Sequence, residues 1–316
     1  MRFQITTKQE NGWHSLQLKD TANGTTVEII PDAGAILNAF YVKKGDRTVN
    51  LVEGYQSMQD WNENKTKGFR SAKMSPYVCR VADSTYRWEG KVHHLNKFML
   101  NGIAIHGVLY DASFQVMETK AGNDHAEVEL RYVYRADDPG YPFAYDCLIK
   151  YRLDKDNTLT LSTLIHNHDK EPIPVSDGWH PYFTFGGKVD GLTLKVATDA
   201  MLEYDSAVIP TGNTLPVEGF RAGFTIGDKF FDNGYVLDPK APAPQAVLGN
   251  PALGMSIEFH ADAHYPYLQV YIPPHRNSIA IENLSSAPDA FNNGMGLVSL
   301  KPDESMVFSV KYKVNI

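Results

Sequence analysis

The stretch 126-AEVELRYVYR-135 alternates apolar and polar side chains with a period of two. This alternation is typical of a β-strand with one buried face and one solvated face. Two further segments, 146-DCLIKYRL-153 and 158-TLTLSTLI-165, repeat the pattern, and the turn-forming residues 154-DKDN-157 separate them. We therefore predict that these three segments are neighbouring strands of an antiparallel sheet.

The remainder of the chain also favours strands over helices. The C-terminal stretch 306-MVFSVKYKV-314 alternates in the same way, whereas the best helical candidate is the short segment 57-SMQDWNENK-65 with Ser57 as its N-cap. The proline-rich 239-PKAPAPQ-245 is typical of an extended surface loop and not of a domain boundary. With no internal repeat in 316 residues, we predict an all-β protein of packed antiparallel sheets that forms one domain over residues 1–316.

Composition limits the class of partner. The 37 acidic and 30 basic residues give a net charge of −7, and no run of Lys and Arg exceeds two residues, which disfavours nucleic acid and anionic membranes as partners. The opening residues lack the apolar region of a secretory signal, and no run approaches the roughly 18 apolar residues of a membrane helix. Cys79 and Cys147 are the only cysteines, too few for a disulfide framework. We expect a cytoplasmic protein that binds a neutral or cationic small molecule, and the oligomeric state stays open.

Motifs for nucleotide cofactors and metals are missing. The chain contains no Gly-x-x-x-x-Gly-Lys loop, no Gly-x-Gly-x-x-Gly after a strand and no Gly-x-Ser-x-Gly. Paired histidines without a nearby cysteine are poor zinc ligands, so we interpret them as surface residues. The pairs are His93 with His94, whose adjacency places them on opposite faces of a strand, His166 with His168, and His260 with His264. We expect neither a metal nor a cofactor.

Two histidines stand in unusual surroundings. In 100-LNGIAIHGV-108, His106 precedes Gly107, where a backbone can approach a ligand closely. In 177-DGWHPYFTF-185, His180 lies among a tryptophan, a proline and three other aromatic residues. A buried imidazole needs hydrogen-bond partners or it costs stability. His180 is therefore either a core histidine bonded to the backbone or a functional group.

A carboxylate completes the group of candidates. In 278-SIAIENLSSAPDAFNNG-294, Ile279 and Ile281 share one strand face and Glu282 points the other way. Glu282 is either a solvent-facing residue or a base that lines a cleft. The turn 286-SAPDAFN-292 follows and is expected to hold Glu282 rigidly.

These segments, in this order, resemble the aldose 1-epimerase (galactose mutarotase) family, and the resemblance extends over most of the chain. Seven short motifs in the family's order make the match specific, although each motif is weak alone. The matching stretches are 80-RVADSTYRWEGKVHHL-95, His106–Gly107, 140-GYP-142, 180-HPYF-183, 232-DNGYVL-237, Ile281–Glu282 followed by 288-PDAFN-292, and 300-LKPDE-304.

The resemblance implies a galactose mutarotase-like β-supersandwich and interconversion of the α and β anomers of a free aldose. It implies that Glu282 is the base for the C1 hydroxyl proton, that His180 is the acid for the ring oxygen, and that His106 supports the charge that develops there. The remaining roles implied are the binding of sugar hydroxyls by Arg80 and Asp232, and stacking on the sugar by Tyr182, Phe183 or Trp179. Neither metal nor nucleotide is needed for this chemistry.

Three residues depart from the family's common pattern. Cys79 stands where an asparagine often precedes the arginine, and Val108 where a second glycine often follows the His-Gly pair. Trp179 replaces a smaller polar residue before the second histidine. We expect all three residues to lie near the sugar and to affect which sugar is preferred.

Two alternatives stay open beside a mutarotase of free hexoses. A sugar-phosphate epimerase needs cations beside Arg80, and Lys97 or Arg276 is available for that purpose. A non-catalytic carbohydrate-binding module, which related sandwiches also form, would keep the aromatic residues and Asp232 but has no need of an acid and a base together.

Overall fold

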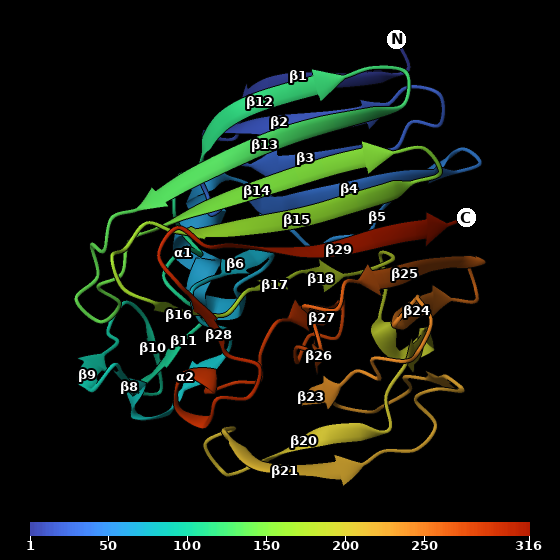
Figure 1. Cartoon of the computed structure of the whole chain (residues 1–316). Coiled ribbons are helices and arrows are strands. Elements are labelled where there is room, and N and C mark those ends of the chain that lie inside the picture. Colours follow the sequence, from blue (N-terminus) through green and yellow to red (C-terminus); the bar gives the residue numbers. More distant parts are fainter.

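Antiparallel sheets make up most of the protein, whose computed structural model describes all residues from 1 to 316 (Figure 1). A five-stranded sheet contains, in spatial order, β1 (Phe3–Glu10), β2 (Trp13–Asp20), β3 (Thr26–Ile30), β4 (Ile36–Lys44) and β5 (Arg47–Asn50). A nine-stranded sheet contains β12 (Gln115–Ala121), β13 (His125–Tyr134), β14 (Tyr145–Asp154), β15 (Thr158–Asn167), β29 (Ser305–Asn315), β25 (Met255–Ala261), β24 (Ala246–Asn250), β19 (Thr193–Val196) and β22 (Phe224–Thr225).

A third large sheet has eight strands. It contains β21 (Pro210–Pro216), β20 (Ala200–Tyr204), β23 (Asp232–Val236), β26 (Tyr267–Tyr271), β27 (Ile279–Leu284), β17 (Gly178–His180) and β6 (Ala72–Met74), with β18 (Tyr182–Phe183) also paired to β27. Smaller sheets are formed by β10 (Met99–Leu100), β11 (Ile103–Ile105) and β7 (Arg80–Val81), by β16 (Ile173–Val175) with β28 (Val298–Leu300), and by β8 (Thr85–Trp88) with β9 (Lys91–His94). The helices are α1 (Met58–Gly68) and α2 (Ala290–Asn293), with 3₁₀ turns at Ala82–Ser84 and Val189–Gly191.

The predicted antiparallel strands are confirmed. β13, β14 and β15 are consecutive neighbours, with Leu130 opposite Ile149 and Ile149 opposite Thr163. The predicted C-terminal strand is β29, and it adds to the same sheet beside β15. The alternating apolar residues of these strands are mostly buried, whereas the intervening charged residues are partly exposed, as the period of two requires.

The core lies between the five-stranded and nine-stranded sheets and continues beneath the eight-stranded one. In Figure 1, β1 to β4 lie behind β12 to β15, and contacts between β1 and β12 and between β2 and β13 join the two layers. One cluster of 66 buried residues extends from Phe3 to Val314. The Tyr151 hydroxyl donates to the Ala35 carbonyl at 2.7 Å, which satisfies a polar group that would otherwise be costly in the core.

The predicted helix is confirmed as α1, with Ser57 as its N-cap. The amide of Asp60 donates to the Ser57 hydroxyl at 3.1 Å, which satisfies one of the free amides of the first turn. The helix ends at Gly68, and its C-cap residue Phe69 has a left-handed backbone (φ +52°) that turns the chain sharply. Residues 239–245, predicted as a surface loop, contain no helix or strand and connect β23 to β24.

The prediction that the paired histidines are surface residues is wrong for His93. His93 and His94 lie on opposite faces of β9 as predicted, but His93 is buried and not a surface residue. Its ring stacks on Tyr86, with centroids 4.8 Å apart and an interplanar angle of 18°. No three His, Cys, Asp or Glu side chains are arranged to hold a metal ion, and no helix is long and apolar enough to cross a membrane.

Candidate functional site

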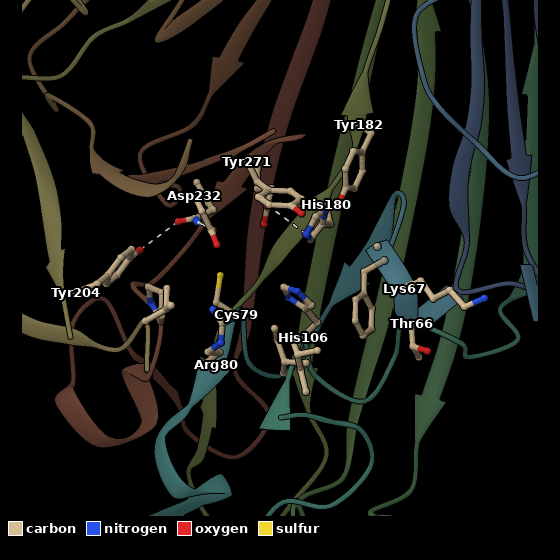
Figure 2. A pocket seen from close by; sticks show the side chains of 18 residues that line it. Thr66, Lys67, Cys79, Arg80, His106, His180, Tyr182, Tyr204, Asp232 and Tyr271 are labelled. Carbon is tan, nitrogen blue, oxygen red and sulfur yellow. Dashed lines mark hydrogen bonds and ion pairs between the residues drawn. The ribbon is translucent and has the colours of Figure 1, made fainter. Parts of the chain in front are cut away.

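Most of the predicted site residues line one cavity. It lies on one face of the eight-stranded sheet and has a volume of about 180 Å³. Its floor is built by register, because Gln269 of β26 is opposite Glu282 of β27 and Asp232 of β23 is opposite Tyr271. Its lining includes six of the residues predicted for the site, namely Arg80, His106, His180, Tyr182, Asp232 and Glu282. Figure 2 shows His180 and His106 pointing into one space, with Asp232 and Arg80 across from them.

His180 and Glu282 form a buried acid–base pair. The His180 Nε2 atom lies 3.3 Å from Glu282 Oε1, and the two residues are only 5% and 1% exposed. Burial raises the pKa of Glu282 well above its ordinary value, and the nearby Asp232 carboxylate adds to this. Burial also lowers the pKa of His180 to about 4. Burial therefore disfavours the charged form of each partner, namely the ionised carboxyl group of Glu282 and the protonated ring of His180.

His106 closes the cavity opposite His180. Their rings meet edge to face, with centroids 4.9 Å apart and an angle of 89°, and Phe69 packs on the other side of His106 at 4.7 Å. Burial holds the pKa of His106 well below its ordinary value, and His180 and Arg80 contribute in the same direction. His106 is therefore a neutral imidazole near neutral pH, suited to hydrogen bonding.

The backbone around His106 shows why a glycine follows this histidine. His106 has a left-handed backbone (φ +63°), and its amide donates to the Cys79 carbonyl at 2.9 Å. Gly107 follows, also left-handed, and a Cβ atom at this position would lie 2.2 Å from the Ser75 carbonyl oxygen. The glycine is therefore required by the close approach of Ser75, not by a ligand as predicted. Phe69, Cys79 and Val208 of the lining share this left-handed backbone with His106.

Several polar atoms in the cavity have no partner within the chain. Glu282 Oε2, His180 Nδ1 and His106 Nδ1 are buried and form no hydrogen bond. Leaving such an atom unpaired costs about 1–3 kcal/mol. A buried carboxyl oxygen beside His180 is thus maintained at the expense of stability, which is typical of a group that serves a ligand.

Asp232 is held by a short chain of hydrogen bonds. Gln269 Nε2 donates to Asp232 Oδ1 at 2.9 Å, and the Tyr204 hydroxyl donates to Gln269 Oε1 at 3.1 Å. A Cβ atom at Gly234 would lie 2.4 Å from the Tyr204 hydroxyl, so only glycine lets Tyr204 reach across β23. Burial raises the pKa of Asp232, while Arg80 and the bond from Gln269 oppose that shift. These bonds orient Asp232 through one carboxyl oxygen, and the second oxygen stays available to a ligand.

The turn that follows Glu282 is hydrogen-bonded to the segment that carries Arg80. The Asp289 amide donates to the Arg80 carbonyl at 2.7 Å, and Asp289 Oδ1 accepts from the Ala82 amide at 2.9 Å. Pro288 of the same turn lines the cavity. The expectation that residues 286–292 hold Glu282 is therefore replaced by a link between this turn and the strand of the arginine.

Trp179 does not line the cavity, so the prediction that it contacts the sugar is wrong. It precedes His180 on β17 and so faces the opposite side of the sheet, where it is 1% exposed. Its indole Nε1 donates to the Thr163 hydroxyl at 3.3 Å, and Lys73 Nζ lies 4.6 Å from its ring. Val108 and Phe183 are likewise core residues away from the cavity, and only Cys79 of the three departures lines it.

The two cations considered for a phosphate are paired elsewhere. Lys97 Nζ lies 2.7 Å from Asp111, Arg276 Nε lies 2.7 Å from Asp190, and neither residue lines the cavity. Lys67 lines the cavity but points away from the two histidines in Figure 2, and its Nζ donates to Asn64 at 2.8 Å. Arg80 is the one arginine in the lining. The lining residues that the sequence did not single out include Phe69, Tyr204, Gln269 and Tyr271.

The sequence as a whole matches a known protein family. The profile of the aldose 1-epimerase family matches residues 14–313. The chain belongs to the aldose 1-epimerase family. It is accordingly an isomerase of the epimerase type.

Among family members, an aldose 1-epimerase from Streptococcus thermophilus is 26% identical over 68% of this chain and 62% of that protein. A maltose epimerase from Levilactobacillus brevis is 22% identical over 76% of this chain and 74% of that protein. The solved structure of a galactose mutarotase-like protein from Clostridium acetobutylicum superimposes with a TM-score of 0.87 at 19% identity, covering 99% of both chains. This likeness confirms the predicted all-β, galactose mutarotase-like fold.

Proposed function

We propose that this family member interconverts the α and β anomers of a free hexose such as glucose or galactose, in the cytoplasm. The observation that carries the proposal is the buried pair of His180 Nε2 and Glu282 Oε1, 3.3 Å apart, in a small cavity lined by hydrogen-bonding groups. Anomer exchange requires a base and an acid at neighbouring oxygens, and this pair supplies both.

In the ring-opening step, Glu282 takes the proton of the C1 hydroxyl and His180 gives a proton to the ring oxygen. The electron pair of the C1–O5 bond goes to O5, and a carbonyl forms at C1. Rotation about C1–C2 and the reverse transfers then close the other anomer. The step starts from the form of the pair with its proton on His180, and the pair holds one proton throughout, because Glu282 gains the proton that His180 loses. General acid–base catalysis of this kind contributes about 10²–10⁴-fold for each group.

The other lining residues orient the sugar in this proposal. His106, which burial keeps neutral, hydrogen-bonds near the reacting oxygens and stabilises charge as it develops. Arg80 and Asp232 bind sugar hydroxyls through charge-assisted bonds, and Tyr182, stacked on His180 at 5.1 Å, offers an aromatic face. A carbohydrate-binding module would need the hydroxyl ligands alone, so the unpaired Glu282 oxygen beside His180 favours catalysis.

Optical rotation tests the proposal directly. Freshly dissolved α-glucose or α-galactose is mixed with the enzyme, and the approach to anomeric equilibrium is followed by polarimetry or proton NMR. We expect a rate proportional to enzyme concentration and well above the buffer rate. Saturable sugar binding without rate enhancement would instead identify a binding module.

Exhaustive chelation is expected to leave the activity unchanged, and no nucleotide should be required. The proposed steps move protons only between side chains and sugar oxygens, so they involve neither a Lewis acid nor a redox carrier. The measurement is the mutarotation rate before and after dialysis against a chelator. A loss that one specific metal restores would contradict the proposed chemistry.

A neutral hexose is expected to react faster than its 6-phosphate. A phosphate favours an arginine cluster or a helix N-terminus, and the cavity supplies Arg80 against the carboxyl groups of Glu282 and Asp232. The measurement is kcat/KM for glucose, galactose and their 6-phosphates at fixed ionic strength, because salt screens the overall charge of −7. A tenfold advantage for a phosphate, about 1.4 kcal/mol in transition-state stabilisation, would instead establish the sugar-phosphate alternative.

A further inference from the structure

A fully buried ion pair lies behind the strand that carries His180. Lys73 of β6 is directly opposite Trp179 of β17, and its Nζ atom lies 4.6 Å from the Trp179 ring. The two side chains therefore share the face of the sheet that turns away from the cavity. Lys73 Nζ donates to one carboxylate oxygen of Asp177, the residue that precedes β17, and both side chains are 0% exposed. Neither Lys73 nor Asp177 lines the cavity.

Hydrogen bonds from this pair and its neighbours hold the start of β17. Lys73 Nζ also donates to the Gly178 carbonyl at 3.3 Å, so one ammonium group binds two consecutive residues. The Tyr265 hydroxyl donates to the other carboxylate oxygen of Asp177 at 2.6 Å. Ser285, which follows β27, accepts from the Asp177 amide through its hydroxyl at 2.8 Å and donates its own amide to the Asp177 carbonyl at 2.9 Å. The start of β17 is therefore held by β6 on one side and by the end of β27 on the other.

The ring of His180 has no hydrogen bond that would fix it independently of β17. Its Nδ1 atom has no partner, and its Nε2 atom faces Glu282 at 3.3 Å. Tyr182 stacks on the ring, and His106 meets it edge to face. The Ser71 amide donates to the His180 carbonyl at 2.9 Å. The position of the ring therefore depends on packing and on the backbone of β17.

The register of β17 decides which side chain faces the cavity. The pairing of Gly178 with Leu284 places His180 opposite Glu282 on the neighbouring strand. A shift of one residue would turn Trp179 to the cavity and His180 to the core. Three residues that are buried on both faces offer too little contrast between apolar and polar sides to prevent such a shift.

Stability alone does not account for a buried ion pair at this position. Burial raises the pKa of Asp177, whereas Lys73 and the Tyr265 hydroxyl lower it, so the carboxylate depends on these partners for its charge. Well-packed apolar residues of similar volume usually stabilise a protein as much as a buried ion pair does, or more. The best-attested role of a buried polar group is to select one register, because a slipped register leaves that group unpaired.

We propose that Lys73 and Asp177 are positioning residues that fix the register of β17 and thereby keep His180 facing Glu282. The inference rests on the proposed function, in which His180 is the acid, but neither Lys73 nor Asp177 touches the sugar. Without the pair, the His180 ring faces Glu282 for only part of the time, and kcat falls in proportion. KM changes little, because the sugar-binding groups on β7 and β23 keep their places.

The test replaces the polar cluster by apolar residues in the variant Lys73→Met/Asp177→Leu/Tyr265→Phe. The measurements are the melting temperature, the polarimetric kcat and KM for glucose and galactose, and the crystal structure. Arg131→Met/Asp146→Leu is the matched control, because this ion pair between β13 and β14 also has a buried carboxylate and lies outside the cavity.

We expect the apolar variant to melt within about 5 °C of the wild type, because apolar replacement of a buried ion pair is often close to neutral. Its kcat should fall about tenfold or more while KM changes less than about threefold, since the lost interaction acts on the acid and not on sugar binding. In its crystal structure, His180 Nε2 should no longer reach Glu282. The control should change kcat less than about twofold, because it leaves β17 intact.

Ser285→Ala decides the matter if the apolar variant does not fold by circular dichroism. It removes the hydroxyl that binds the Asp177 amide, so it should lower kcat about threefold or more with KM unchanged. Ser278→Ala is its control, because Ser278 is also buried, lies at the other end of β27 and donates its hydroxyl to Glu53. A kcat for Ser285→Ala no lower than that of Ser278→Ala would contradict the inference.

A folded apolar variant with wild-type kcat would overturn the inference and leave the proposed function standing. An equal loss of kcat in the control, or a rise in KM that parallels the loss of kcat, would overturn it as well, because either result indicates a general distortion. If the wild-type enzyme turns over no hexose, the proposed function fails, and the crystal structure still tests the register. An unchanged position of His180 in the apolar variant would then overturn the inference.

Discussion

Glu282→Gln is expected to reduce catalysed mutarotation by about 10³-fold or more while leaving sugar binding nearly intact. The amide keeps the size of the carboxyl group and its contact with His180, but it cannot take the C1 hydroxyl proton. The measurement is the polarimetric kcat for glucose beside the dissociation constant from calorimetry. Near wild-type turnover would remove Glu282 from the role of base.

Stability provides the control for this substitution. Glu282 is buried, its pKa is raised by burial, and its Oε2 atom has no partner, so its neutral replacement should unfold at the same temperature or a higher one. Glu28→Gln makes the same chemical change on β3, away from the cavity, and should leave kcat within twofold. A large fall in the melting temperature of Glu282→Gln would instead indicate that the carboxyl group is structural.

Strands β13, β14 and β15 of the nine-stranded sheet could be predicted from the sequence, and the eight-stranded sheet that carries the site could not. β13, β14 and β15 are each ten residues long with one solvated face, so their alternation is regular. The sheet that carries the site also contains β6, β17 and β18, which have two or three residues each and are buried on both sides. No period can be read from segments so short, and the pairing of β17 and β18 with β27, and of β6 with β17, is set by tertiary packing.

The site residues were predicted through motifs, and the errors have a common physical origin. Trp179 is adjacent to His180 on a strand, and successive strand residues point to opposite faces of the sheet. Trp179 therefore lies in the core although it belongs to the same motif as His180. Lys97 is paired with Asp111 and Arg276 with Asp190, and only the fold reveals these two pairs. Gln269 and Tyr271 belong to a strand of ordinary appearance, and they reach the site only through register with Glu282 and Asp232.

His180→Asn is expected to lower kcat by about 10²–10⁴-fold with a modest loss of sugar affinity, because asparagine can hydrogen-bond to the ring oxygen but cannot protonate it. His264→Asn, at an exposed position outside the cavity, should have no effect. The measurement is kcat for glucose in both variants, with the buffer rate subtracted. Unchanged kinetics in His180→Asn would favour a core histidine without a catalytic role.

The pH dependence separates a proton donor from a merely structural histidine. In the wild-type enzyme the pair takes up a second proton only as the pH falls towards the His180 pKa of about 4, so kcat/KM should stay level well below the ordinary imidazole value of about 6.5. Above the raised pKa of Glu282 the pair holds no proton, and wild-type activity should fall. In His180→Asn the remaining activity needs only ionised Glu282, so it should rise through the same range. Opposite slopes in the two proteins are the expected result, since the loss of a packing residue would scale the profile without inverting it.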